Sequence, residues 1–330
     1  MTQLASVIVL SYNGRGYLGP CLSSLESSSH SEIEVLLVDN GSTDGSIQWV
    51  EATFPEIRVV ANGQNLGFAG GMNRGIIEAR GRFIAFLNQD TTVRPEWLEN
   101  LVTALEDPAV GIAGSKIYYP DGVTLQHAGG IIRYPQALAD HYGYRQRDQG
   151  QWDQVKDVDY VTGAAFATRR DVLESIGVFD EGFHPAYFED TDLCFRARDA
   201  GYRVVYVPGA VLVHHESATT VRDSFGYYLA YHTARLRFIL KHYSVLQITD
   251  DFYPAERAWL EGGQSLDERR ALGLAYQAAR AAKGGLPSLV PTTSRLLDRL
   301  AGEAAGKPEA TTPRDAPSGV LSRLKALLSR

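Results

Sequence analysis

Two acidic motifs, far apart in the chain, offer the clearest chemistry in this sequence. Asn88-Gln89-Asp90 follows the apolar run from Phe83 to Leu87, and Glu189-Asp190-Thr191-Asp192 precedes the helical pattern that starts at Leu193. A carboxylate at the end of a buried strand is suited to hold a divalent cation on a phosphate. A second carboxylate at the mouth of the same cleft can take a proton from a hydroxyl. Together the motifs predict transfer of a group activated by a diphosphate.

The first half of the chain alternates strand-like and helix-like segments. Apolar runs predict strands at 6–10, 35–38, 58–60 and 83–87, and the residue patterns predict helices at 18–25, 47–52 and 95–106 and a glycine-rich loop that enters a helix at 65–80. Such alternation predicts an α/β fold, with a mostly parallel sheet covered by helices on both faces. Ligands of these sheets bind beyond the carboxyl ends of the strands. We therefore expect the polar clusters at 11–13, 39–40 and 88–90 to converge on one crevice.

The second half is less regular. Residues 118–157 predict loops and short strands, and we expect a strand at 161–167 and a helix at 171–176. A pair of strands broken at Pro208-Gly209 is expected within 202–214, followed by a helix at 225–243. The expected organisation is an α/β domain at 1–250 (a nucleotide-binding half at about 1–115 and an acceptor-side half at about 116–250), a helical extension at 251–300, a linker at 301–318 and a short amphipathic helix at 319–330.

Composition excludes several classes of protein. Hydrophobic residues make up 44% and charged residues 22%, which is ordinary for a globular protein, and the net charge of -7 argues against a general nucleic-acid binder. Cys21 and Cys194 lie in apolar helical patterns, which favours buried free thiols in a reducing cytoplasm. The sequence shows no signal peptide at Met1 and no stretch of the roughly 20 apolar residues that a membrane span needs.

Each motif also has a structural interpretation. Asp90 can cap the turn before Pro95, and an acidic first turn suits the positive end of a helix dipole. The dipole explains some acids, but not three in four positions. It also lowers the pKa of a carboxyl, so burial or a neighbouring acid would have to raise the pKa of Asp190 again if it is a base. His214 and His215 follow a strand whose alternation lets only one of them face the cleft.

Taken together, these motifs resemble the inverting family 2 glycosyltransferases of the GT-A fold, and most closely the bacterial rhamnosyltransferase-like branch. The segments that carry the resemblance, in the order found in the family, are 7–13, 38–46, 65–73, 87–90, 177–181, 188–192 and His214. They cover about residues 5–220, and the tail beyond about 250 is not covered. The resemblance implies a Rossmann-like, mostly parallel central sheet.

The resemblance also implies a role for each matched residue. The nucleotide pocket would be lined by Ser11, Tyr12, Asn13 and Asp39, with Asp39 on the base, and the ribose and diphosphate would lie along Asn65, Gly67 and Asn73. Asn88-Gln89-Asp90 stands where the family has an Asp-x-Asp motif, so Asp90 is its one carboxylate for Mg²⁺ or Mn²⁺. His214 would be a second metal ligand. Asp190 matches the catalytic base, while Glu189 and Asp192 would orient it or contact the acceptor.

The implied reaction is a single displacement. The acceptor hydroxyl attacks the anomeric carbon in line with the departing nucleoside diphosphate, Asp190 takes the hydroxyl proton, and the anomeric centre inverts. The branch favours dTDP-rhamnose as donor. The expected acceptor is a hydroxyl of a glycan or of a lipid-linked acceptor in the synthesis of cell-surface polysaccharide.

Other functions make different demands on the sequence. A nucleotidyltransferase that forms a nucleotide sugar needs a basic glycine-rich loop after the first strand, where residues 11–20 offer only Arg15. A non-catalytic sugar- or nucleotide-binding module has no need of Asp190. A dehydrogenase is disfavoured because no GxGxxG motif follows Leu10.

The C-terminus adds an apolar stripe. One face of the predicted terminal helix gathers Val320, Leu321, Leu324, Leu327 and Leu328. Three partners suit this face: the inner surface of the cell membrane, a second copy of the chain in a homo-oligomer, and the protein's own surface.

Overall fold

The computed structural model describes residues 4–216, 223–281 and 291–305. The chain divides into two compact units, Met1–Thr219 and Thr220–Arg330, and the first unit holds every predicted site residue. The predicted helix at 319–330 lies outside the described residues. So does most of the predicted linker, and the described part of that segment, 301–305, is helical.

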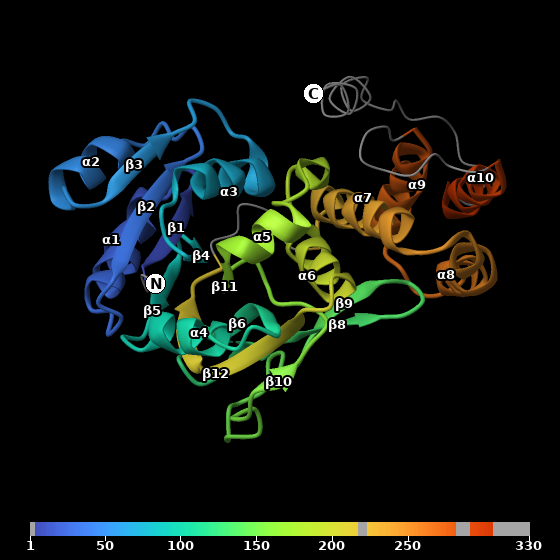
Figure 1. Cartoon of the computed structure of the whole chain (residues 1–330). Helices are drawn as coiled ribbons and strands as arrows, with labels where there is room; N and C mark the ends of the chain where they lie inside the picture. Colours follow the sequence, from blue (N-terminus) through green and yellow to red (C-terminus); the bar gives the residue numbers. More distant parts are fainter. Residues whose placement is uncertain (1–3, 217–222, 282–290, 306–330) are drawn as a thin grey trace. The chain divides into compact units, whose positions relative to one another are not determined.

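A central sheet organises the first unit (Figure 1). Its strand order is β10-β12-β6-β11-β4-β1-β2-β3. The strands are β1 (Ala5–Ser11), β2 (Ile33–Asp39), β3 (Arg58–Ala61), β4 (Phe83–Asn88), β6 (Val110–Tyr118), β10 (Lys156–Asp157), β11 (Ala165–Arg169) and β12 (Arg203–His214). β4, β1, β2 and β3 pair in parallel, as the sequence predicts, and β6 and β12 form a second parallel pair. β11 lies between the two groups and is antiparallel to both neighbours.

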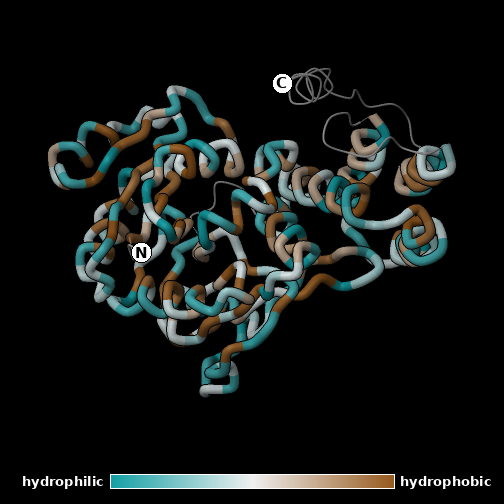
Figure 2. The backbone as a smooth tube through the Cα atoms, in the orientation of Figure 1, coloured by the Kyte–Doolittle hydropathy of each residue, from teal (hydrophilic) through white to brown (hydrophobic). Residues whose placement is uncertain are grey.

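Helices cover both faces of this sheet because successive strand residues point to opposite sides. Val7 and Val9 face the core formed with α1 (Arg15–Glu26), α2 (Ser46–Thr53) and α4 (Trp97–Leu105). Ile8 points to the opposite face and packs against α3 (Gly67–Glu78). The packing is so close that a side-chain Cβ added to Gly75 of α3 would lie 2.4 Å from Ile8. Figure 2 shows the apolar strands running through the centre of the unit. The α/β fold is therefore confirmed.

Smaller elements complete the first unit. The helical ones are α5 (Arg170–Ile176), the 3-10 turn η1 (Glu181–Phe183) and α6 (Glu189–Asp199). The short strands are β5 (Thr91–Val93), β7 (Leu125–His127), β8 (Gly130–Arg133) and β9 (Leu138–His141). β5 pairs with β12 and β7 with β6, whereas β8 and β9 form a separate hairpin. β5 and β7 thus extend the sheet beside the end of β12.

Two details of the second half differ from the sequence prediction. The expected pair of strands at 202–214 is one continuous strand, β12, whose pairing with β6 shifts register between Val207 and Val211. Pro208 cannot donate to a ladder hydrogen bond, but a bulge tolerates it without ending the strand. The expected strand at 161–167 begins only at Ala165, because Thr162 and Gly163 form the loop before β11.

The second unit is helical, as expected for the C-terminal extension. It contains α7 (Phe225–His242), the π-helical turn η2 (Gln247–Phe252), α8 (Tyr253–Leu260), α9 (Leu266–Ala281) and α10 (Pro291–Ala305). Arg235 and Glu256 form a fully buried ion pair between α7 and α8, and Tyr276 of α9 donates its hydroxyl to Glu256 Oε1 at 2.6 Å. A search of the described helices finds none long and apolar enough to cross a membrane.

We expect Glu256→Gln to lower the free energy of unfolding of the helical unit by roughly 3–5 kcal/mol, because it leaves the Arg235 guanidinium buried without its counter-charge. Glu261→Gln, at an exposed position of the same region, is the matched control and should change it by less than about 0.5 kcal/mol. Urea denaturation followed by circular dichroism measures both variants. Equal losses would contradict the assignment of the stabilising role to the buried pair.

Candidate active site

The two acidic motifs lie near the carboxyl end of β4. The backbone N–H of Asn88, the last residue of β4, donates to the carbonyl of Ala164 at 3.0 Å. The neighbouring N–H of Gly163 donates to Oδ2 of Asp190 at 2.7 Å. One short loop before β11 therefore joins the strand end that carries Asn88-Gln89-Asp90 to the first turn of α6. Each motif therefore contacts this loop, which lies between them.

Both oxygens of the Asp190 carboxyl are held while the residue stays half-exposed. Besides the bond from Gly163, Oδ1 accepts from the backbone N–H of Thr191 at 2.6 Å and from its hydroxyl at 3.2 Å. Burial raises the pKa of the Asp190 carboxyl above its ordinary value, although these hydrogen bonds oppose the shift. Asp190 thus combines fixed orientation with increased basicity, which is what a general base needs.

Glu189 occupies a different environment. Its side chain is buried, and Oε2 has no hydrogen-bond partner among the described residues. Burial raises the pKa of Glu189 well above the ordinary value, and the negative charges of Asp190 and Asp192 raise it further. The raised pKa favours the protonated form of Glu189, which would remove one negative charge from the crowded first turn of α6 and could donate a hydrogen bond as well as accept one.

Asp192 points into the protein. It is fully buried, and its Oδ2 accepts from Nε of Arg196 at 2.9 Å. The same guanidinium donates to the carbonyls of Ile176 at 2.6 Å and Val178 at 2.8 Å. Asp192 therefore ties α6 to the end of α5, and its full burial leaves it no surface for an acceptor.

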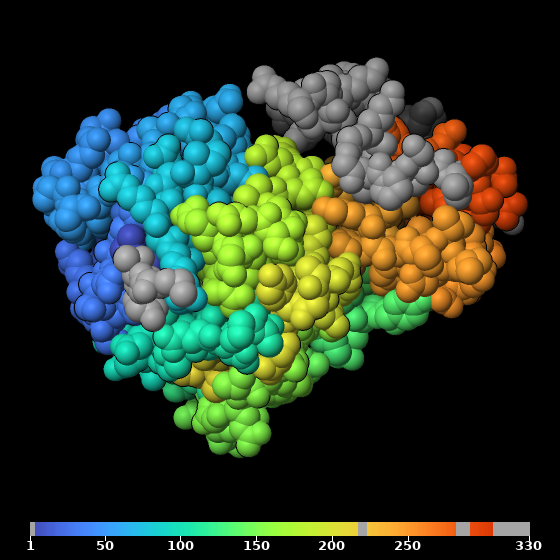
Figure 3. Space-filling model, in the orientation of Figure 1, coloured from blue at the N-terminus to red at the C-terminus, as the bar shows by residue number. Residues whose placement is uncertain are grey.

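The chain enters α6 through a strained backbone. Tyr187 and Phe188, neither of them glycine, have φ values of 82° and 65°. Such conformations cost about 1–3 kcal/mol each and persist only where packing enforces them. Here Phe188 is buried, and Pro185 accepts a backbone hydrogen bond from Phe68 of α3 at 3.0 Å. In Figure 3 the blue segment of α3 and the yellow-green segment around residue 180 adjoin at the surface.

Asp90 and His214 lie side by side at the ends of neighbouring segments. His214 Nε2 is 3.2 Å from Asp90 Oδ1, and their side chains are 12% and 6% exposed. The backbone N–H of His215 donates to the carbonyl of Asp90 at 2.9 Å. Within the described part of the chain, no group of three or more His, Cys, Asp or Glu side chains could hold a metal ion. A divalent cation at this pair would need further oxygen ligands from a bound substrate.

Gln89 shapes the loop after β1. Its Oε1 accepts from the Ser11 hydroxyl at 2.8 Å and from the Tyr12 N–H at 3.0 Å. The amide lies so close to Gly14 that a Cβ there would meet Oε1 at 1.8 Å, so a larger residue at this position would have to displace the Gln89 amide. Asn13 extends the contact by accepting from the Thr43 N–H at 2.8 Å. These predicted nucleotide-binding residues hold one another in place.

Asp39 keeps an oxygen for a ligand. Its Oδ2 accepts from the N–H groups of Gly41 and Ser42 at 3.0 and 2.9 Å, while Oδ1 is buried with no partner among the described residues. A buried carboxylate oxygen without a donor is costly, so this atom is suited to accept a hydrogen bond from a bound molecule.

The loop before α3 is fixed by its own side chains. Asn65 Oδ1 accepts from the Gly67 N–H at 2.9 Å, and Asn40 Nδ2 donates to the Gly67 carbonyl at 2.9 Å. Gly67 has a φ of +74° and lies where a Cβ would be 2.6 Å from His184, which requires glycine. The backbone at the start of α3 is therefore rigidly shaped.

Asn73 uses both ends of its amide within the protein. Its Oδ1 accepts from the Phe179 N–H at 3.0 Å, and Nδ2 donates to the Phe179 carbonyl and to Glu181, each at 3.0 Å. It is buried, so the structure places it as a brace between α3 and η1.

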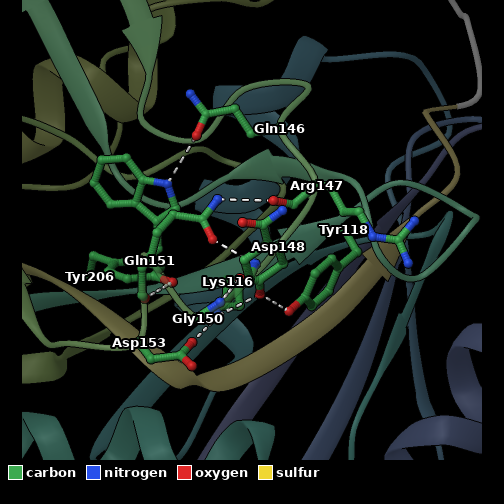
Figure 4. Close-up of polar contacts among 11 residues, drawn as sticks. Lys116, Tyr118, Gln146, Arg147, Asp148, Gly150, Gln151, Asp153 and Tyr206 are labelled. Atoms are coloured by element: carbon green, nitrogen blue, oxygen red, sulfur yellow. Dashed lines mark hydrogen bonds and ion pairs between the residues drawn. The ribbon is translucent and has the colours of Figure 1, made fainter.

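A polar cluster fixes the loop around residues 148–153 to the sheet (Figure 4). Lys116 of β6 is buried and binds Asp148 at 2.8 Å and also Asp153, while the Tyr118 hydroxyl donates to Asp148. Burial alone raises the pKa of Asp148, but the hydrogen bonds from Lys116 and Tyr118 outweigh it and lower the pKa to about 2. Asp148 is therefore charged at neutral pH and holds its loop on β6.

Sequence reasoning placed Asn40 in the polar cluster at 39–40 but gave it no role, and it missed two other residues that build this site. Gly163 acts through its backbone N–H, and Gln126 lies in the loop-rich region, where neither spacing nor periodicity marks it. Cys21 and Cys194 are buried free thiols, as expected, and burial raises the pKa of Cys21 to about 12.

Comparison with known families identifies the first half of the chain. Residues 6–177 match the family model described as Glycosyl transferase family 2. This match spans β1 to the end of α5, and so covers the donor-side loops and Asp90. Asp190 and His214 lie beyond it.

Individual proteins show the same similarity. N-acetylglucosaminyl-diphospho-decaprenol L-rhamnosyltransferase of Mycobacterium tuberculosis is 29% identical over 266 residues, which is 74% of this chain and 86% of that protein. An uncharacterized protein of Sinorhizobium fredii is 31% identical over 231 residues, 66% of this chain, and the chain spans only 25% of its length. A mannosyltransferase of Pyrobaculum calidifontis, solved with GDP-Man and Mn²⁺, has a TM-score of 0.52 and 18% identity over 98% of this chain and 80% of its own. The similarity to the P. calidifontis structure shows a shared fold.

We expect Asp192→Asn to destabilise the first unit by roughly 3–5 kcal/mol, because it removes the charge paired with Arg196 in a buried site. Asp199→Asn, at the exposed end of the same helix, should change stability by less than about 0.5 kcal/mol. Chemical denaturation measures both. A stable Asp192→Asn protein would show that the residue is not a structural tie between α5 and α6.

Proposed function

Because this chain belongs to glycosyl transferase family 2, we propose that it transfers a sugar from a nucleoside-diphosphate donor to an acceptor hydroxyl, with inversion at the anomeric carbon. The observation that carries this proposal is the bond from Gly163 to Asp190, next to the backbone bond between Ala164 and Asn88. A candidate base therefore adjoins the strand end that the family model covers.

Asp190 has the properties of the base in this reaction. Half-exposed, it is open to an acceptor hydroxyl, and its raised pKa strengthens its pull on the hydroxyl proton. As the hydroxyl oxygen forms its bond to the anomeric carbon, the bond to the leaving diphosphate breaks and the proton passes to Asp190. One displacement of this kind inverts the carbon. The raised pKa of Glu189 favours its protonated form, because burial and the nearby charge of Asp190 oppose a second charge beside the base.

Asp90 and His214 are the proposed ligands of Mg²⁺ or Mn²⁺. A carboxylate oxygen and an imidazole nitrogen 3.2 Å apart, both largely buried, suit a shared divalent cation. Such a cation would neutralise negative charge on the diphosphate as it leaves. Asp90 and His214 come from the turn after β4 and the end of β12, so the sheet itself sets their separation. The Mn²⁺ in the P. calidifontis structure agrees with this assignment.

Asp39 supports a donor whose base carries a ring N–H. Its buried Oδ1, which has no partner among the described residues, can accept from the ring N–H of thymine, uracil or guanine, which adenine and cytosine lack. The M. tuberculosis relative is a rhamnosyltransferase, and this favours dTDP-rhamnose.

The name of the same relative also bears on the acceptor. That protein is named for N-acetylglucosaminyl-diphospho-decaprenol, a lipid-linked sugar. We accordingly propose a hydroxyl of a glycan or of a lipid-linked acceptor used in polysaccharide synthesis, with transfer at the cytoplasmic face of the membrane.

A panel of nucleotide sugars with Mg²⁺ or Mn²⁺, read by release of nucleoside diphosphate, tests the reaction. We expect Asp190→Asn to lose about 10²-fold or more in kcat while it still binds nucleoside diphosphate, because only the base is removed. Asp90→Ala should instead weaken metal-dependent binding of the diphosphate. Release by neither wild type nor variants, with any donor, would overturn the proposal, and unchanged turnover in Asp190→Asn would remove Asp190 from it.

The fall of kcat at acidic pH should report the pKa of Asp190. A base works only when deprotonated, so activity is full above its pKa and is lost as the pH falls through it. Because burial raises the pKa of Asp190, we expect kcat to fall at a higher pH than an ordinary aspartate would give. Measuring kcat from about pH 4 to pH 8, with circular dichroism as a check on folding, gives the midpoint. A loss only at the ordinary aspartate pKa would contradict the shift.

A further inference from the structure

Gln126 on β7 contacts the far side of the His214 ring. Gln126 Oε1 is 2.7 Å from His214 Nδ1, and Gln126 is only 6% exposed. Strand pairing places these two side chains together. His127 of β7 pairs with Ile117 of β6, and Ile117 pairs in turn with Leu212 of β12. Gln126 is therefore held in register with the end of β12.

The contact decides which ring nitrogen of His214 carries a proton. A neutral imidazole has one N–H, and an amide oxygen can only accept. With Oε1 facing Nδ1, the proton lies on Nδ1, and Nε2 presents its lone pair to Asp90 Oδ1 at 3.2 Å. Two electron-rich atoms at this separation repel each other, unless a second ring proton on Nε2 or a bound metal cation lies between them.

The opposite orientation of the amide would give the opposite tautomer. Its NH₂ group would donate to Nδ1, His214 would become an N–H donor to Asp90, and Nε2 would have no lone pair for a metal. In the orientation found here, Gln126 Nε2 is buried and has no hydrogen-bond partner among the described residues. A buried N–H donor without an acceptor is unfavourable. This orientation of the Gln126 amide is therefore favoured when a bound ligand supplies an oxygen to Nε2.

We propose that Gln126 is a positioning residue that fixes His214 in the tautomer able to bind a divalent cation through Nε2. The inference rests on the proposed metal use of Asp90 and His214. Partners that accept a hydrogen bond from the second nitrogen of a metal-binding histidine orient the ring and raise its basicity, and their loss costs about 10–100-fold in metal affinity.

Mn²⁺ titration of the full chain, with and without a saturating nucleoside diphosphate and read by electron paramagnetic resonance of the free ion, tests the proposal. Gln126→Leu removes the acceptor and should weaken Mn²⁺ binding by about 10–100-fold. Gln126→Glu keeps an acceptor for the Nδ1 proton and should bind Mn²⁺ at least as tightly as the wild type. Gln146→Leu, at an exposed position in the adjoining loop, is the matched control and should leave the affinity unchanged.

Nitrogen-15 NMR of histidine-labelled protein gives a readout independent of metal and activity. The His214 ring, assigned by comparison with His214→Ala, should carry its proton on Nδ1 in metal-free wild type and in Gln126→Glu. The preference should be lost in Gln126→Leu. A proton on Nε2 in the wild type, or wild-type Mn²⁺ affinity in a folded Gln126→Leu protein, would overturn the role of Gln126.

Asp90→Ala separates this inference from the proposed function. If Asp90→Ala loses Mn²⁺ binding and Gln126→Leu does not, the metal assignment stands and only the role of Gln126 fails. If the wild type binds no Mn²⁺, with or without a nucleoside diphosphate, the metal assignment fails and the inference fails with it.

Discussion

The reversed pairing of β11 with β4 is the constraint on which the rest of the site depends. β4 belongs to the parallel group, but β11 runs against it, with Ala165 opposite Leu87. The loop that precedes β11 therefore lies at the carboxyl end of β4, where ligands of such sheets bind. A parallel β11 would have placed that loop at the amino end of β4. The reversal gives the Gly163 N–H its position beside both motifs.

Most polar side chains around the carboxyl ends of these strands form hydrogen bonds within the protein. Gln89 holds Ser11 and Tyr12, Asn40 and Asn65 hold the start of α3, and Asn73 braces η1. Their hydrogen bonds are made before any ligand arrives, so these loops are largely preformed. Preformed loops lose little conformational entropy when a ligand binds. Asp39 Oδ1, Glu189 Oε2 and the Gln126 amide nitrogen, which lack partners among the described residues, are exceptions.

The acidic turn of α6 shows how neighbouring carboxyls acquire different tasks. Asp192 points inward and is paired with Arg196, Glu189 is buried with a raised pKa, and Asp190 stays half-exposed. Three charges in one helical turn would repel one another strongly. The ion pair between Asp192 and Arg196 and the raised pKa of Glu189 both reduce this repulsion. The structure also resolves the expected conflict between the helix dipole and a basic Asp190, because burial outweighs the opposing hydrogen bonds.

The sequence by itself determined the alternating strands and helices of the first half, and the polar clusters at the ends of β1, β2 and β4. Both are local properties, since hydrophobic periodicity and turn residues act over a few positions. Only the tertiary structure decided the direction of β11, the inward turn of Asp192, and the contacts of Gly163 and Gln126. These depend on which distant segments pack together, and on backbone atoms that every residue type shares, so no spacing in the sequence records them.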